Sequence, residues 1–88
     1  MDIRQLFAAN LRRIRHEKGL SQEELAYEAD VDRAHVSKIE RSLTYVGLEI
    51  VEKFARKLGV PPDAFLKPLS RTSDKKPTEK PSGRRFKR

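Results

Sequence analysis

Hydrogen-bond donors crowd the stretch 30–41, which reads DVDRAHVSKIER. Its donor side chains are Arg33, His35, Ser37, Lys38 and Arg41. Arginine presents a planar fork that matches guanine O6 and N7, lysine presents a point donor to the same atoms, and an alanine methyl can lie against a thymine methyl. These residue types therefore suit the recognition of base edges, although a charged face turned to water is the usual explanation of such a helix taken alone.

The segments around this stretch must hold it in place. The stretch 30–41 offers only Val31, Val36 and Ile39 with which to anchor a helix over 33–41. Before it, Ser21 and Glu24 form the pattern of a capping box, which predicts a short helix over 22–29. The three residues between the two helices leave room only for a tight turn, so we expect a positive φ at Asp30 and an N-cap at Asp32. Two short helices joined in this way, with the small Ala26 where they cross, are typical of a helix-turn-helix.

Helical periodicity also marks the rest of residues 1–69. Phe7, Leu11 and Ile14 share one face of a first helix that Gly19 ends. An amphipathic fourth helix follows from Leu48 to Leu58 and ends at Gly59, and the Pro61-Pro62 pair predicts a short fifth helix that ends near residue 66 or 67. Two residues between the third and fourth predicted helices are poor helix caps. Serine accepts a positive φ poorly, so we expect the third helix to end in a different shape at Ser42. Gly47 is a weak N-cap for the fourth helix.

The basic charge of the chain is concentrated near its C-terminus. Residues 1–69 carry 12 Lys/Arg and 11 Asp/Glu, a balance of +1, whereas residues 70–88 carry 8 Lys/Arg and 2 Asp/Glu, a balance of +6. The stretch 70–88 has one aromatic and no aliphatic residue, so we expect a domain over 1–69 followed by a disordered basic tail over 70–88. The tail either neutralises phosphates beside a binding site or serves only as a solubilising end.

Composition excludes several classes of function. The chain of 88 residues has no cysteine, two separated histidines and no glycine-rich phosphate loop, so no nucleophile–base pair, metal site or cofactor site suggests itself, and we expect no enzyme. His35 lacks a second ligand at metal spacing, and His16 is expected on the surface. No apolar run reaches the roughly 20 residues of a membrane span, and we expect a cytoplasmic protein.

Three motifs together resemble the Cro/C1-type (XRE) family of bacterial and phage DNA-binding regulators. They are GLSQEELAYEADV, VSKIER and LEIVEKFARKLGV, and the resemblance covers roughly residues 3–66. It implies an all-α, compact five-helix, lambda-repressor-like domain. It further implies that Gln22 binds a phosphate, that Arg33, Ala34, His35 and Lys38 read the major groove, that Ser37 and Arg41 contact bases or backbone, and that Arg15 and Glu40 form a structural pair.

The resulting expectation is a transcription regulator, bacterial or phage-encoded and nucleoid-associated, that binds double-stranded DNA. One short helix reads few base pairs, so two copies in a homodimer are expected on a pseudo-palindromic operator, with guanine opposite Arg33 or Lys38. The alternative is a helical adaptor or antitoxin-type binder whose tail holds RNA or an acidic partner. Tyr27 is either partly packed or near phosphate, and Tyr45 and Ile50 belong either to a dimer contact or to ordinary packing.

Overall fold

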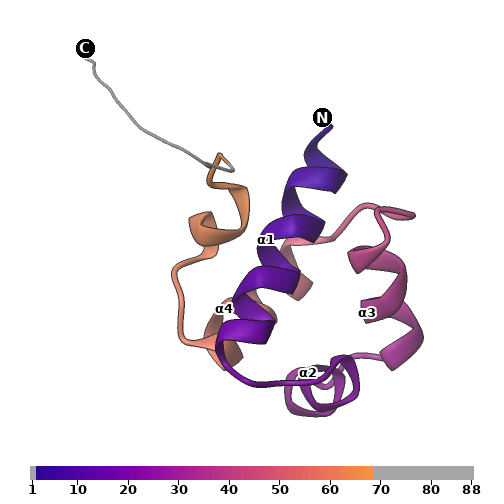
Figure 1. The fold of residues 1–88 in the computed structure, drawn as a ribbon. Coiled ribbons are helices and arrows are strands. Elements are labelled where there is room, and N and C mark those ends of the chain that lie inside the picture. The colour runs from indigo at the N-terminus through magenta and orange to yellow at the C-terminus, as the bar shows by residue number, and fades with distance from the viewer. Residues whose placement is uncertain (1, 69–88) are drawn as a thin grey trace.

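The computed structural model describes residues 2–68, in which the chain folds into four α-helices and one 3₁₀-helix (Figure 1). These elements are α1 (Ile3–Glu17), α2 (Gln22–Ala29), α3 (Arg33–Glu40), α4 (Leu48–Leu58) and η1 (Pro62–Leu66). The predicted domain boundary at residue 69 and the predicted tail over 70–88 lie outside the described residues. Within residues 2–68 the all-α prediction is confirmed.

The helix bounds follow local capping chemistry. The predicted capping box is present, because the Ser21 hydroxyl accepts from the Glu24 amide at 3.0 Å and the Glu24 carboxylate accepts from the Ser21 amide at 2.8 Å. Asp2 and Gln5 form a second capping box at the start of α1, and the hydrogen bond from the Gln5 amide lowers the pKa of the Asp2 carboxyl. The predicted α2, α3 and α4 agree with the observed helices to within one residue.

Two expectations about the chain's irregular positions are corrected. Ser42 has a φ of +63°, so the end of α3 takes the left-handed conformation that glycine would adopt there. The Ser42 and Leu43 amides donate to the Ile39 and Lys38 carbonyls at 3.0 and 2.9 Å, and these bonds hold the strained backbone in place. The fifth segment, η1, is a 3₁₀-helix in place of the predicted α-helix. It is only five residues long, and the Ala64 amide donates to the Pro61 carbonyl, which is the three-residue spacing of a 3₁₀ turn.

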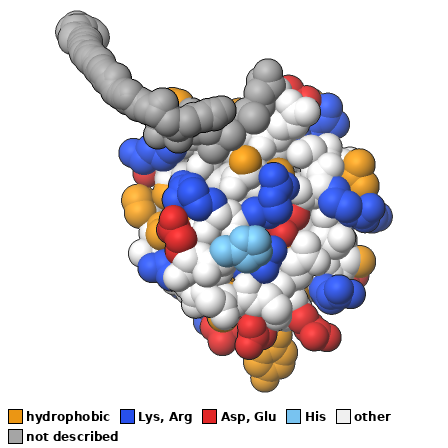
Figure 2. Space-filling model, viewed as in Figure 1, with side chains coloured by type: hydrophobic (Ala, Val, Ile, Leu, Met, Phe, Trp, Pro, Cys, Tyr) orange, Lys and Arg blue, Asp and Glu red, His pale blue; other side chains and the backbone are white. Residues whose placement is uncertain are grey.

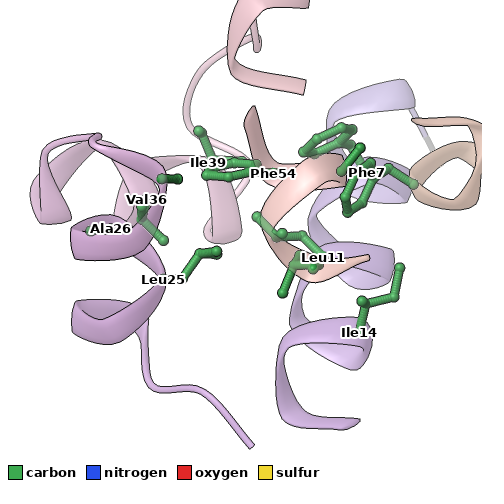
Figure 3. Packing of buried hydrophobic residues seen from close by; sticks show 12 residues of the cluster. Phe7, Leu11, Ile14, Leu25, Ala26, Val36, Ile39 and Phe54 are labelled. Carbon is green, nitrogen blue, oxygen red and sulfur yellow. The ribbon is translucent and has the colours of Figure 1, made fainter. Parts of the chain in front are cut away.

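One apolar core joins all five elements (Figure 3). Its largest fully enclosed side chains include Phe54 of α4, Phe65 of η1, Leu11 of α1 and Ile39 of α3. Figure 3 shows Leu25, Ala26 and Val36 approaching Phe54 from the α2–α3 side, opposite α1. Burial of this kind contributes about 25 cal/mol for each Å² of apolar surface removed from water, and Val36 and Ile39 hold α3 against the rest of the domain in this way.

A buried amide fastens η1 to α1. The Asn10 side chain is 1% exposed, and its Nδ2 donates to the carbonyls of Phe65 and Lys67 at 2.9 and 3.0 Å. Beside it, the rings of Phe7 and Phe65 stack with their centroids 5.0 Å apart. These contacts satisfy carbonyls at the end of η1 that would otherwise be buried without a donor.

Candidate nucleic-acid interface

The turn between α2 and α3 fixes the direction in which α3 leaves the core. Asp30 has φ +57° and ψ +50°, as predicted, and the Val31 amide returns to the Ala26 carbonyl at 2.9 Å. Asp32 then caps α3 by accepting from the Ala34 amide at 3.2 Å. Ala26 is 4% exposed in the cluster that also contains Val36 and Ile39 of α3, so a small side chain allows the two helices to approach closely.

Helix α3 divides into an apolar inner face and a polar outer face. Val36, Ile39 and Glu40 are buried. The predicted base-reading and backbone-contacting residues keep their side chains accessible: Arg33, Ala34, Lys38 and Arg41 are exposed, and His35 and Ser37 are half-buried. Within residues 2–68, the side chains of Arg33, His35, Ser37, Lys38 and Arg41 make no hydrogen bond or ion pair. Their donors are therefore available to an external ligand.

A buried ion pair ties the far end of α3 to α1. The Arg15 Nε donates to Glu40 Oε2 at 2.6 Å and its Nη2 donates to Glu40 Oε1 at 2.9 Å, with the two side chains 8% and 2% exposed. The remaining Arg15 Nη1 donates to the Leu20 carbonyl at 2.8 Å, next to the start of α2. A bidentate pair of this kind fixes geometry strongly, and removal of one partner leaves a buried charge alone.

Gln22, the first residue of α2, lies at the same carboxylate. Its Nε2 donates to Glu40 Oε1 at 3.0 Å, while the residue as a whole is half-buried and reaches the surface. A primary amide nitrogen carries two donor hydrogens, so one remains after this bond. The N-terminus of α2 adds the partial positive charge of its unpaired amides, which favours an anion there.

Arg12 is a cationic residue beside α3 that the sequence interpretation missed. Its guanidinium Nη1 donates to the Glu40 carbonyl, so Arg12 is anchored at the C-terminus of α3 next to Arg41. The signal in the sequence is its position one helical turn before Arg15 on α1. Arg12 thus adds a positive charge beside the C-terminus of α3.

Charge is distributed unevenly over the molecule (Figure 2). Acidic side chains gather at the lower edge of this view, where Figure 1 places α2, and Lys and Arg side chains are spread over the surface above them. The exposed acids of α2 are Glu23, Glu24 and Glu28. Two of them, Glu23 and Glu24, lie in the first turn beside Gln22, so a polyanion is expected to approach α2 only through the Gln22 side chain and the unpaired amides of that turn.

Aromatic residues outside α3 have clear environments. Tyr27 is 87% exposed, so partial packing of its ring is excluded. Tyr45 is 68% exposed and lies under the Arg4 guanidinium at 4.7 Å, whereas Ile50 packs against the core.

His16 is exposed, as predicted. Across residues 2–68 no group of three or more His, Cys, Asp or Glu side chains is placed to hold a metal ion.

An apolar groove lies away from the α3 surface. It has a volume of about 230 Å³ and is formed by the start of α1, the loop before α4 and the end of η1. Four of the six large hydrophobic residues that are exposed among residues 2–68 line it: Ile3, Tyr45, Leu48 and Leu66.

No helix in the part of the chain that the structure describes is long and apolar enough to span a membrane.

Comparisons with known proteins agree on one class. A family model described as helix-turn-helix matches residues 11–65. A hypothetical transcription factor of Neisseria meningitidis serogroup B is 38% identical over 89 aligned positions, which cover 93% of this chain and 84% of that protein. The control protein C.BamHI of Bacillus amyloliquefaciens is 44% identical over 66 positions, covering 74% and 82%. The crystal structure of the restriction-modification controller protein C.AhdI from Aeromonas hydrophila superposes with a TM-score of 0.68 at 37% identity, covering 70% of this chain and 94% of that one.

Proposed function

Because the chain belongs to the XRE-type helix-turn-helix family of DNA-binding transcription regulators, we propose that it binds a specific operator and that α3 reads the bases. The observation that carries this proposal is the outer face of α3, where the donor side chains of Arg33 and Lys38 have no partner within residues 2–68. The core holds this helix rigidly, and its donors have no partner within the described residues. Such donors are suited to contacts with a ligand. The helix is short enough to lie along a major groove.

In the proposed complex, each group has a distinct task. Arg33, at the first position of α3, makes a bidentate contact with guanine, and Lys38 donates to guanine further along the groove. Ala34 and His35 face neighbouring base edges, and Ser37 and Arg41 contact bases or backbone. Gln22 and the N-terminus of α2 bind a phosphate, which sets the register of α3 on the duplex.

We further propose that the apolar groove pairs two copies of this chain. Its four exposed hydrophobic residues are 45–85% exposed, so a second copy that covers them would remove large apolar side chains from water. The buried centre of a homodimer interface is apolar in the same way. A twofold pair would present two α3 helices to a pseudo-palindrome.

Alanine substitutions at Arg33 and Lys38 test base reading. Each bidentate base contact is worth about 1–3 kcal/mol of discrimination, so each variant is expected to bind its operator roughly 5- to 150-fold more weakly while binding of random DNA changes little. A gel shift with both duplexes measures this. Arg56→Ala is the matched control, because Arg56 is an exposed arginine of α4 that pairs with Glu52. The control is expected to bind both duplexes as the unsubstituted protein does.

Two results would contradict the proposal. If the unsubstituted protein binds every duplex equally at all salt concentrations, α3 reads no sequence, and a protein-binding adaptor becomes the better account. If Arg33→Ala weakens operator and random DNA by the same factor, the residue serves only as a phosphate contact.

A further inference from the structure

The Glu40 carboxylate is shared by two partners with different tasks. Its Oε1 accepts from Arg15 Nη2 at 2.9 Å and from Gln22 Nε2 at 3.0 Å, and its Oε2 accepts from Arg15 Nε at 2.6 Å. Arg15 belongs to α1, Gln22 to α2 and Glu40 to α3, so one buried group connects three helices. Only the Gln22 side chain reaches from this group to the surface, because Arg15 and Glu40 are both buried.

Arg15 makes it possible for a carboxylate to stand here. A lone carboxylate beside a DNA backbone would repel the phosphates, and its burial would be costly. The bidentate guanidinium cancels that charge, and Arg15 itself is further fixed by the Leu20 carbonyl at 2.8 Å. The Gln22 amide thus meets a neutralised acceptor that is rigid on every side.

We propose that Glu40 is a positioning residue for DNA binding, which holds the Gln22 amide so that its second hydrogen points toward a phosphate. A free glutamine side chain samples many rotamers, and each must be given up when the amide binds. The bond to Glu40 fixes the rotamer before DNA arrives, so less entropy is lost on binding. The contact also makes the phosphate site depend on the end of α3, because that helix end carries the carboxylate. This inference rests on the proposed function, since it presupposes that Gln22 meets DNA.

The test is a double-mutant cycle with Gln22→Ala, Glu40→Asp and the double variant, with a duplex of random sequence as the probe. Aspartate keeps the charge beside Arg15 but is one methylene shorter, so its carboxylate withdraws from Gln22, whereas a glutamine would keep an oxygen that accepts from Gln22. Phosphate contacts do not depend on sequence, so no operator is required. We expect Gln22→Ala and Glu40→Asp each to weaken binding, the latter by roughly two- to ten-fold, the range expected for one side chain that is no longer held in place. Once Gln22 is alanine, Glu40→Asp is expected to add no further loss.

A second readout separates positioning from stability. Glu40→Asp also disturbs the ion pair, so affinities are compared at temperatures where every variant is folded. Arg15→Lys is the matched control, because it weakens the same ion pair and leaves the Glu40–Gln22 bond intact; it is expected to lower the melting temperature and keep most of the affinity. In NMR spectra of the free protein, the Gln22 side-chain amide is expected to become mobile in Glu40→Asp and to stay ordered in Arg15→Lys. If Glu40→Asp does not fold, the double variant Arg15→Met with Glu40→Met replaces it, since it removes the acceptor of Gln22 and leaves no buried charge alone.

The outcomes are distinguishable. An equal loss when Glu40→Asp is added to the unsubstituted protein and to the Gln22→Ala variant would show a purely structural role and overturn the inference, while DNA binding would stand. No loss in Gln22→Ala would overturn it as well, because Gln22 would then meet no phosphate. Failure of the unsubstituted protein to bind any duplex would overturn the proposed function itself.

Discussion

Ser42 shows how single residues at the edge of α3 carry strain. It is one of two non-glycine residues among 2–68 with a positive φ, and the other is Asp30. Aspartate tolerates the left-handed region better than serine, because its side chain can hydrogen-bond locally. No hydrogen bond from the Ser42 hydroxyl to the described residues compensates for its conformation, so the strain at this position is relieved only by the backbone bonds around it.

Ser42→Gly is therefore expected to stabilise the protein. The left-handed conformation costs a non-glycine residue about 1–2 kcal/mol, and the greater freedom of glycine in the unfolded chain offsets part of that gain. We expect the free energy of unfolding to rise by about 0.5 to 1 kcal/mol, as measured by urea denaturation. Asp30→Gly is the matched control and is expected to gain less. A loss of stability in Ser42→Gly would mean that its hydroxyl makes a contact that stabilises the folded state.

At the scale of helices, local signals in the sequence were sufficient for α2, α3 and the turn between them. Ser21, Glu24 and Asp32 act on amides within three residues of themselves, so their patterns are readable without knowledge of the fold. The end of α3 and the form of η1 were predicted wrongly, because both are formed by local backbone bonds that the residue types do not indicate, and Ser42 takes the left-handed conformation that serine accepts poorly. Propensity is a weak prior at such positions.

Contacts between distant helices were not readable from the sequence. Asn10 and Phe65 are 55 positions apart, and Gln22 and Glu40 are 18 positions apart. No periodic pattern in the sequence predicts either contact. The pairing of Arg15 with Glu40 was implied only by resemblance to a family, and the groove emerges only when α1, α4 and η1 come together. The residues proposed to meet DNA were named from the sequence, whereas the network that positions Gln22 required the structure.

The close approach of α2 and α3 is expected to fail if Ala26 is enlarged. Ala26→Leu forces three extra carbon atoms into a fully packed contact, and overpacking of this kind costs about 1–3 kcal/mol. Ala34→Leu is the matched control, because Ala34 lies on the exposed side of α3. Urea denaturation of both variants measures the difference. Equal stabilities would show that the interhelical contact has room to spare, contrary to the 4% exposure of Ala26.

At the scale of the whole molecule, we propose two separate binding surfaces. The outer face of α3 meets DNA, and the groove formed by α1, α4 and η1 meets a second copy. The basic residues of 70–88 stay a prediction, as either an additional phosphate contact or a solubilising end. Separation of the two surfaces means that a substitution in the groove changes assembly without touching any residue proposed to contact a base.

Leu48→Glu is expected to separate the proposed dimer. Leu48 is 85% exposed, so the monomer loses nothing when it changes, and an acid suits the first turn of α4. In sedimentation experiments without DNA we expect this variant to be monomeric where the unsubstituted protein is dimeric. Leu43→Glu is the matched control, because Leu43 is 58% exposed but does not line the groove. A Leu48→Glu variant that stays dimeric would place the interface elsewhere.

Selection of bound sequences from random DNA tests the central claim most directly. We predict enriched sites with two inverted half-sites whose centres are about 34 Å apart, one helical turn, and a guanine in each half-site that is no longer enriched when Arg33 or Lys38 is alanine. Enrichment of no sequence, or of a single half-site that the Arg33→Ala and Lys38→Ala variants select equally well, would contradict it.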